Sequence, residues 1–340
     1  MAPFGGYNVL VTDNKIPHKE GQYLMSYTTT SVIRCQLDIL TDRSPTGKER
    51  PWRDHKLHNQ YLAMAYDDID PAKAVRLRDC ATSLSFDVAL DGGKRLATAN
   101  FCRVRLCPMC QWRRSLKTFG QAIDVLRELG DKWRYVFLTL TLRNVSGGGL
   151  DTTVTHMMQS WQRLSQTKDY KAAVHGHMRT LEITHNLADN TYHPHMHALL
   201  AVRPSYYSGQ RYMSQARWTE LWQRSARLDY TPIVHVESCK GTQPHQIAET
   251  AKYAVKSGDY IIPDDWQLTV DTVALLDKVL ANRRFVAWGG IMADVRRQLR
   301  LDDVDDGDLI HVEPDQDKPD KAHRVYYSWA SGYNQYVQDV

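Results

Sequence analysis

Residues 192–200 read YHPHMHALL, a pattern typical of a β-strand with one buried face. Side chains of a strand alternate between its two faces, so His195 and His197 lie on the same face, about 7 Å apart along the chain. Met196 and Leu200 then point the other way, toward a hydrophobic core. The stretch therefore predicts a sheet with one apolar face and one polar face that carries two imidazoles.

The two imidazoles are placed to converge on one divalent cation. A third ligand is predicted on the preceding strand, residues 178–185, where Glu182 points away from the apolar Leu181. If the two strands are hairpin neighbours, Glu182 lies beside the histidine pair. His193 is a further candidate ligand, which ranks lower because a proline separates it from the pair. The alternative is that the histidines are structural.

The strand predicted at residues 133–142 repeats the alternation, with leucines on one face and Thr139 and Thr141 on the other. The triple glycine at 147–149 is expected to break the chain after this strand. Mixed strands and helices with at least one hairpin favour an α+β fold around an antiparallel sheet, rather than a doubly wound parallel sheet. Further helices are predicted at 51–78, 116–129, 151–164, 214–226, 244–256 and 271–281, and a further strand at 232–236.

Four cysteines crowd into residues 80–110 around a predicted hairpin with a Gly92-Gly93 turn. Two cysteines at x2 spacing can fold round one ion, and a second pair completes a tetrahedron of thiolates that suits Zn²⁺. The alternative is a set of buried cysteines without metal. A closed site of this kind is structural and stabilises a subdomain too small for a core of its own. The four candidate zinc ligands are Cys80, Cys102, Cys107 and Cys110.

Basic side chains flank the cysteines, and residues 101–120 contain neither Asp nor Glu. Such a segment on a zinc-stabilised subdomain is suited to contacts with DNA phosphates. The predicted DNA-binding residues are Arg103, Arg105, Arg113, Arg114 and Lys117.

The helix predicted at 244–256 places Glu249 and Tyr253 at i, i+4 on one face, with Lys256 three residues further. A phenol, a carboxylate and an ammonium in proximity can attack, deprotonate and neutralise a phosphodiester. The phenol is a poor nucleophile while protonated, because its pKa is about 10. Taken alone, a Tyr–Glu pair at this spacing is more often a surface contact.

Composition is that of a globular protein: 340 residues, 42% hydrophobic and 24% charged. No apolar run is long enough for a membrane span, and no secretory signal is visible, so we expect a cytoplasmic protein with reduced thiols. The net charge of +4 is unevenly distributed. Residues 301–340 hold ten acidic and three basic side chains, which leaves a basic body with an acidic tail. This distribution favours a polyanion-binding protein whose tail competes for the same surface.

Read together, these motifs resemble the rolling-circle replication initiators of small bacterial plasmids, in the single-tyrosine branch of the HUH endonuclease superfamily. The resemblance covers roughly residues 51–290. The motifs that carry it are Pro51-Trp52-Arg53 with Lys56, Phe101-Cys102-Arg103-x-Arg105-x-Cys107-Pro108-x-Cys110, Thr139-Leu140-Thr141, Glu182, His195-Met196-His197, and Glu249-x3-Tyr253-x2-Lys256.

The resemblance implies an antiparallel HUH endonuclease core and a role for each motif residue. His195 and His197, with Glu182 as third ligand, would bind Mn²⁺ or Mg²⁺. Tyr253 would be the nucleophile that forms a 5′-phosphotyrosine, Glu249 the base that activates water later, and Lys256 the cation that stabilises charge on the phosphate. The implied partners are single-stranded or hairpin origin DNA and the host helicase and polymerase.

The expected organisation follows the motifs along the chain. We expect an irregular lead-in at 1–50, a helix and zinc-binding subdomain at 51–125, the endonuclease core at 126–265, a helical extension at 266–300 and an acidic tail at 301–340. Two alternatives remain open: an HUH-type transposase, and a non-enzymatic zinc-stabilised DNA-binding regulator. A zinc hydrolase is disfavoured because the H-E-x-x-H motif is absent from the sequence.

Overall fold

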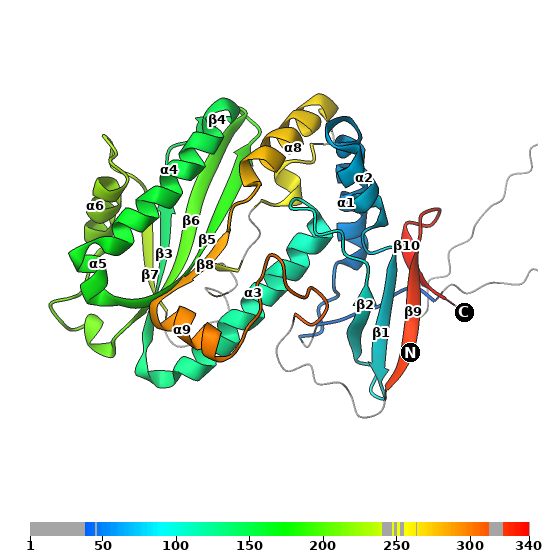
Figure 1. Ribbon diagram of the computed structural model, residues 1–340, viewed down its shortest axis with the longest axis horizontal. Helices are drawn as coiled ribbons and strands as arrows, with labels where there is room; N and C mark the ends of the chain where they lie inside the picture. Colours follow the sequence, from blue (N-terminus) through cyan, green and yellow to red (C-terminus); the bar gives the residue numbers. More distant parts are fainter. Residues whose placement is uncertain are drawn as a thin grey trace, which may run out of the picture. The chain divides into compact units, whose positions relative to one another are not determined.

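The stretch at 192–200 lies within β6 (Thr191–Val202), at the centre of a six-stranded sheet (Figure 1). This computed structural model describes residues 38–44, 46–239, 247, 250–251, 255–262, 264–312 and 322–339, which belong to one compact unit, Leu37–Val340. The sheet has the order β7-β3-β6-β5-β8, and every pairing is antiparallel. The other strands are β3 (Arg134–Thr141), β4 (Val145–Ser146), which pairs with β6, β5 (Val174–Asn186), β7 (Val234–Cys239) and β8 (Val286–Gly289).

The register of β5 against β6 confirms the predicted hairpin. Glu182 lies opposite His195, and Thr180 lies opposite His197. On the other side of β6, Thr139 of β3 lies opposite His197. Because directly paired residues share a face, the two imidazoles and the carboxylate point to the same side of the sheet.

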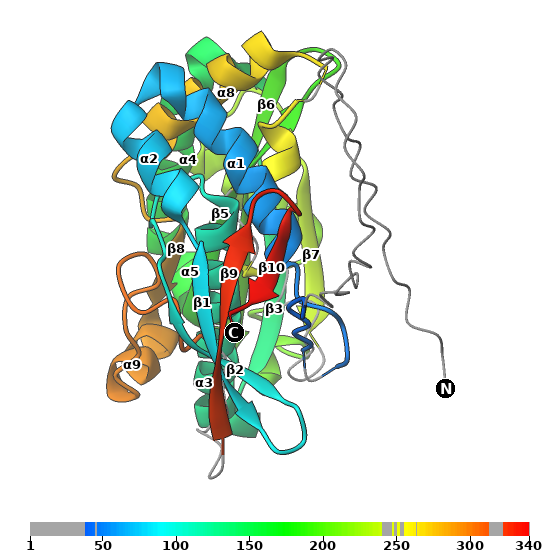
Figure 2. The same ribbon diagram turned by 90° about the vertical axis from the view of Figure 1, so that its right-hand side faces the viewer.

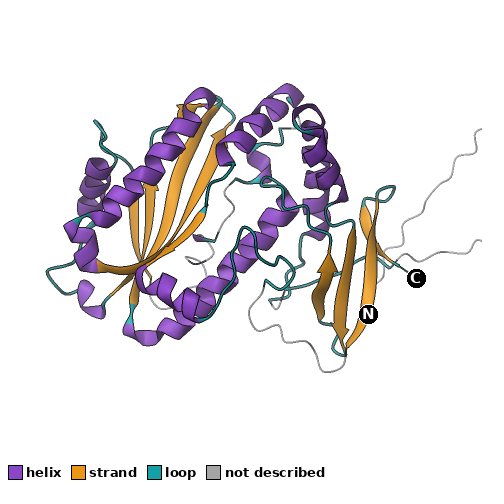
Figure 3. Cartoon of the chain, viewed as in Figure 1, coloured by secondary structure: helices purple, strands orange, loops and turns teal. Residues whose placement is uncertain are grey.

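The apolar face of the sheet packs against helices, as the alternation predicts. Leu138, Met196 and Leu200 are fully buried in the main hydrophobic core. Side chains of α4 (Gly147–Gln166) and α8 (Trp266–Leu280) join the same core, and Figure 1 shows α4 lying along the sheet. The α+β fold class is confirmed (Figure 3).

The opposite face is polar only in part. Phe137, Met178 and Leu199 occupy one end of it and are covered by α3 (Pro108–Leu129) and α9 (Gly290–Gln298), in a second hydrophobic core. The expectation of one uniformly polar face is therefore wrong for this end. The sequence of a strand predicts which side chains share a face. It does not predict which helices, from distant parts of the chain, pack against the second face.

The expected break at the triple glycine is also wrong, because Gly147, Gly148 and Gly149 form the first turn of α4. A Cβ on Gly147 would lie 2.9 Å from Cδ2 of Leu275, so the glycine permits close packing of α4 against α8. The predicted helix at 51–78 is two helices, α1 (Trp52–Ile69) and α2 (Pro71–Asp79). Asp70 caps the second by accepting a hydrogen bond from the amide of Lys73.

A second sheet has the order β10-β9-β1-β2. Its strands are β1 (Ser83–Ala89), β2 (Lys94–Ala99), β9 (Ala322–Ala330) and β10 (Gln335–Gln338), and Figure 2 shows β9 beside β1. The residues of the expected acidic tail thus contribute two strands. The Gly92-Gly93 turn joins β1 to β2, and Gly92 has a φ of 84°. Trp52 of α1 packs edge-on against Phe86 of β1.

The remaining described elements are short helices. They are η1 (Gly130–Lys132), α5 (Lys168–Ala173), η2 (Pro204–Tyr206), α6 (Gln215–Ser225) and η3 (Ser257–Asp259). Most of the helix predicted at 244–256, and residues 1–37 of the lead-in expected at 1–50, lie outside the described residues. Among the helices described, none combines the length and the apolar character needed to cross a bilayer.

Candidate metal centres

The structure brings Glu182, His195 and His197 together, as predicted. The Oε2 atom of Glu182 lies 3.2 Å from Nε2 of each histidine, and one ligand atom from every residue lies within 4.8 Å of the others. Glu182 is 3% exposed and His197 is 8% exposed. The three donors therefore converge on one point at the polar part of the sheet.

The outer nitrogen of each imidazole is held by an oxygen. Nδ1 of His195 lies 3.2 Å from the carbonyl oxygen of His193, and Nδ1 of His197 lies 3.0 Å from Oγ1 of Thr139. A carbonyl oxygen only accepts, so Nδ1 of His195 carries the proton. With its outer nitrogen held in this way, His195 turns Nε2 toward the Glu182 carboxylate, which is the orientation of a metal-ligating imidazole.

The charges around Glu182 favour its ionised form. Burial raises the pKa of Glu182, but hydrogen bonds with His195 and His197 outweigh burial, and the net pKa lies well below its ordinary value. The ammonium of Lys256 lies 3.3 Å from Oε1 of Glu182 and lowers this pKa further. The carboxylate is thus charged at neutral pH and available to a cation.

Two imidazole nitrogens and one carboxylate oxygen form a donor set that fits a divalent metal ion. In a metal-ligating histidine one ring nitrogen faces the ion, and the other is held by a hydrogen bond, as Nδ1 is in both histidines here. His193 is outside the convergent set. Its Nδ1 lies 2.7 Å from Oδ1 of Asn144, and its ring stands 5.4 Å from that of His195. Sequence reasoning missed the orienting role of Thr139, although its position opposite His197 follows from the register.

The predicted nucleophile helix is described only at residues 247, 250–251 and 255–256, so Glu249 and Tyr253 lie outside the described residues. The flanking residues that are described anchor the segment. Thr250 and Val255 are buried, and the hydroxyl of Ser115 donates to the carbonyl of Ala251. Lys256 is the member of the predicted triad that the structure places at the metal centre.

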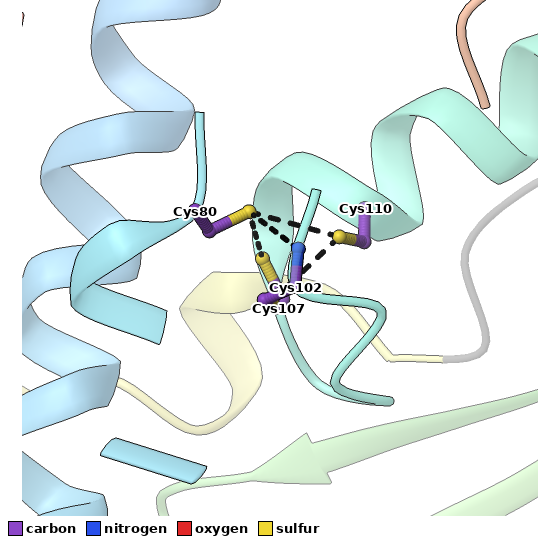
Figure 4. Close-up of side chains that lie close together, drawn as sticks. All are labelled: Cys80, Cys102, Cys107 and Cys110. Carbon is purple, nitrogen blue, oxygen red and sulfur yellow. Dashed lines mark hydrogen bonds between the residues drawn. The ribbon is translucent and has the colours of Figure 1, made fainter. Parts of the chain in front are cut away.

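The four predicted zinc ligands also converge (Figure 4). The sulfur of Cys80 lies 3.6 Å from that of Cys107 and 3.8 Å from that of Cys110, and the sulfurs of Cys102 and Cys110 are 3.7 Å apart. Four sulfurs around one tetrahedral Zn²⁺, with bonds of about 2.3 Å, are about 3.8 Å apart. The cluster therefore has the dimensions of a Zn(Cys)₄ site.

The chain around the cluster is arranged to accept negative charge. The amide of Arg103 donates to the sulfur of Cys110 at 3.2 Å, and the amide of Val104 donates to that of Cys102 at 3.4 Å. The pKa of Cys110 is raised by burial, but hydrogen bonds with the neighbouring thiols outweigh burial and lower it. One member of the cluster is thus favoured as a thiolate, the form that binds metal.

Lys56 supports the same cluster from α1. Its ammonium is buried and donates to the carbonyl oxygens of Arg78 at 2.9 Å and of Cys80 at 2.5 Å. Burial lowers the pKa of Lys56, while the nearby cysteines raise it. The ammonium of Lys56 therefore fixes the C-terminal end of α2 and offsets the negative charge of nearby thiolates.

The basic side chains predicted to bind DNA are occupied by residues 302–312, which we call the acidic strap. Lys117 is 3% exposed and pairs with Asp302 at 2.6 Å, and Arg113 is 4% exposed and donates to the carbonyls of Leu309 and Ile310. Both residues are therefore buried beneath this segment, and their role in DNA binding stays a prediction. Local sequence shows a basic run, but not the acidic segment that folds back onto it.

The other three basic residues also meet the acidic strap. Arg105 pairs with Asp305 at 2.5 Å, and Arg103 donates to the carbonyl of Asp306 at 2.8 Å. Arg114 donates to the carbonyl of Arg103 at 3.1 Å, and less closely to that of Asp305 at 3.5 Å. Because these side chains are less buried than Lys117 and Arg113, they remain predicted DNA contacts.

Comparison with known proteins gives a consistent result. A family described as "Replication protein" (Rep_1) matches residues 93–337. A "Protein rep" of Bacillus amyloliquefaciens is 37% identical, over 88% of this chain and 97% of that protein. Another from Lentilactobacillus hilgardii is 40% identical, over 86% of this chain and 96% of its own length. A third, from Streptococcus pneumoniae, is 35% identical, over 88% and 96%. No solved structure matches the chain significantly.

Proposed function

We propose, from the premise that the chain belongs to the replication protein (Rep_1) family, that it starts plasmid replication by nicking one strand of the origin. The family membership confirms the resemblance to plasmid replication initiators. The observation that carries the nicking activity is the convergence of Glu182, His195 and His197 on one point, with the ammonium of Lys256 beside them.

The convergent donors would hold Mn²⁺ or Mg²⁺. A bound divalent ion would polarise the scissile phosphate and stabilise the charge of the transition state. The chain supplies the rest of the arrangement: Thr139 and the carbonyl of His193 orient the imidazoles, and Glu182 contributes the negative charge that fixes the ion. Lys256, about half exposed, is available to pair with a phosphate oxygen.

Tyr253 is the proposed nucleophile. Three peptide units join it to Lys256, so covalent geometry limits the separation of their Cα atoms to about 11 Å. The phenol oxygen forms a bond to phosphorus and loses its proton, while the bond from phosphorus to the 3′ oxygen breaks and that oxygen takes up a proton. The products are a 5′-phosphotyrosine and a free 3′-hydroxyl, which a host polymerase extends on DNA that a host helicase unwinds.

Glu249 is proposed to act in a later step. After one round of replication, its carboxylate accepts a proton from the water that attacks the second scissile phosphate. This division of labour lets one tyrosine serve a complete cycle, and predicts that Glu249→Ala spares the first nick but impairs termination. Loss of both cleavages in this variant would argue that Glu249 serves the first nick as well.

The cysteine cluster is proposed to hold a structural Zn²⁺. The sulfur separations of 3.6–3.8 Å and the amide donors to sulfur support this proposal. With all four ligands from the chain, the ion has no open position for substrate. The cluster therefore supports the start of α3, and the chemistry belongs to the histidine site.

The nicking proposal is tested with labelled single-stranded oligonucleotides that tile the DNA flanking the gene. With Mn²⁺ the protein should give a protein–DNA adduct that survives denaturing electrophoresis, and chelation should prevent it. Tyr253→Phe should abolish the adduct and leave DNA binding nearly intact, whereas Tyr333→Phe, at an exposed tyrosine, should change neither. An adduct that persists in Tyr253→Phe would refute the assignment.

A further inference from the structure

A basic trough adjoins the metal-binding face between α3, β8 and α9. Its larger part is a cavity of about 330 Å³, and its smaller part, of about 40 Å³, shares three lining residues with it, Val286, Val304 and Asp305. Two aspartates and five arginines line the two parts, which gives a net charge of +3. The arginines are Arg105, Arg114, Arg284, Arg296 and Arg297.

Several donors in this trough lack acceptors. The Nε and Nη1 atoms of Arg114 are buried and have no hydrogen-bond partner among the described residues, although Nη2 donates to backbone carbonyls. The indole nitrogen of Trp288 is also buried without a partner in the described part of the chain. Buried donors are almost always satisfied in native proteins, so these donor atoms leave hydrogen-bonding capacity for a ligand that enters the trough.

The two kinds of side chain match the two parts of a nucleotide. Guanidinium groups bind phosphate oxygens, and an indole ring is a stacking surface for a base. The guanidinium of Arg296 lies 6.0 Å from the centre of the Trp288 ring, so cation and ring are neighbours. A cavity of about 330 Å³ is at the small end of the range for ligand sites and accommodates a nucleotide.

The register places the trough on the same side of the sheet as the metal centre. Val286 of β8 lies opposite Thr180 of β5, which lies opposite His197 of β6. Adjacent strands are about 4.8 Å apart, so Val286 and His197 are separated by about 10 Å across the sheet. This separation corresponds to one or two nucleotides of a single strand.

We propose that this trough is a binding subsite for single-stranded DNA flanking the scissile phosphate, with a base stacked on Trp288 and phosphates paired with Arg114, Arg284 and Arg297. The inference rests on the proposed nicking function. It extends strand recognition from the basic side chains near the cysteines, Arg114 among them, to Arg284, Trp288 and Arg297 at the sheet edge formed by β8 and α9. Arg284 is exposed and makes no ion pair within the described residues, so it is available to phosphate.

Anisotropy of a labelled single-stranded oligonucleotide, measured against salt concentration with the full chain, tests the subsite. Trp288→Ala should weaken binding about tenfold, and Trp288→Phe should restore most of the loss, because a phenyl ring still stacks. Arg297→Ala should reduce the slope of log affinity against log salt by about one. Arg224→Ala is the matched control, since both arginines are exposed and paired with a carboxylate on their own helix.

Photocrosslinking provides a second readout that does not depend on the stability of a variant. An oligonucleotide with a photoreactive base should crosslink to the tryptic peptide 285–296 of the unaltered protein, which contains Trp288. Crosslinks confined to other peptides, or unchanged affinity in Trp288→Ala and Arg297→Ala, would overturn the subsite while the adduct assay leaves the nicking function intact. Absence of any DNA binding or adduct would instead reject the proposed function, and the subsite with it.

Discussion

At the scale of single residues, Glu182 makes the charged and polar contacts that link the groups of the histidine site. It is buried, lies within 3.2 Å of two imidazoles, and has an ammonium 3.3 Å from its second oxygen. A buried carboxylate with three potentially cationic neighbours is a poor packing element but a good metal ligand. The neighbours keep it ionised, and this ionised state is what the proposed ion requires.

Glu182→Gln should remove divalent-ion binding at the histidine site while leaving the fold intact. The amide has nearly the same shape but no charge, and loss of a ligand should reduce Mn²⁺ affinity by at least about a hundredfold. Calorimetric titration of the zinc-loaded protein with Mn²⁺ measures this. Glu220→Gln, at an exposed carboxylate of α6, should bind as the unaltered protein does. Equal affinities in both variants would place the ion elsewhere.

His177 predicts a pH dependence of stability. Burial lowers the pKa of His177 to about 4, and its Nδ1 lies 2.9 Å from the hydroxyl of Tyr170. The unfolded chain therefore binds a proton at higher pH than the folded chain does. The contribution of His177 to the free energy of unfolding is fully present above about pH 6.5. It is lost as the pH decreases from about 6.5 to 4, which lowers the free energy of unfolding by about 2–3 kcal/mol.

Denaturant unfolding at several pH values checks this slope. His177→Gln should flatten it, because glutamine cannot take up the proton. His55, whose pKa burial also lowers to about 4, leaves a residual slope. His323→Gln, at an exposed position on β9, should leave the slope unchanged. A slope that His177→Gln does not reduce would show that this histidine is not buried in its neutral form.

The ligand set illustrates what residue-level sequence reasoning can reach. Alternation within a strand puts His195 and His197 on one face, and a four-residue turn brings Glu182 beside them. Both inferences use separations of fewer than twenty residues. The contact of Lys256 with Glu182 depends on the path of the chain across more than seventy residues, and alternation within a strand carries no information about it.

At the scale of elements, the acidic strap (residues 302–312) determines what α3 presents. Its acidic side chains and backbone carbonyls bind the cations of α3, and its own Val304, Leu309 and Val312 are buried. An element held by both apolar burial and buried ion pairs belongs to the fold. The acidic strap thus covers Arg113 and Lys117, and competition between the tail and DNA for this surface stays a prediction.

Leu309→Ala tests whether the acidic strap contributes to the fold. Leu309 is 1% exposed, so truncation should lower the free energy of unfolding by about 2–4 kcal/mol. Leu90→Ala, at an 86% exposed leucine in the turn after β1, should change it by less than about 0.5 kcal/mol. Denaturant titration of the two variants compares them directly. Similar small losses in both would mean that the strap detaches readily.

Elements with strong local patterns could be predicted, and elements defined by distant partners could not. The β5–β6 hairpin and the alternation of β3 follow from side chains within each strand. By contrast, β8 pairs with β5 across about a hundred residues, and a close approach of backbones at Gly290 permits it. This glycine has a φ of 56°, and a Cβ there would overlap the carbonyl oxygen of His175.

At the scale of the whole molecule, α3 connects the two candidate metal centres. Cys107 and Cys110 lie at its N-terminal end, and Val125 and Leu126 near its C-terminal end pack against the metal-binding face of the large sheet. The strands β9 and β10 complete the small sheet from the opposite end of the sequence. Composition predicts an acidic tail here, but the pairing of β9 with β1 spans more than two hundred residues and leaves no local signal.

Zinc removal should therefore destabilise more than the small subdomain. The purified protein should contain one Zn²⁺ per chain by elemental analysis, and a strong chelator should lower the Tm by at least about 5 °C, because the ion binds the folded state. Cys110→Ser should lose the zinc. Cys239→Ala, at a buried cysteine outside the cluster, should retain it. Full zinc content in Cys110→Ser would exclude the proposed coordination.

In the proposed mechanism, Tyr253 becomes joined to DNA through a reaction that depends on the His195, His197 and Glu182 site. Mass spectrometry of the trypsin- and nuclease-treated adduct, formed with Mn²⁺, identifies the attached residue. We predict a nucleotide phosphate on the peptide Tyr253–Lys256, and none in Glu182→Gln. A nucleotide on any other residue, or an unmodified chain after efficient nicking, would contradict the account.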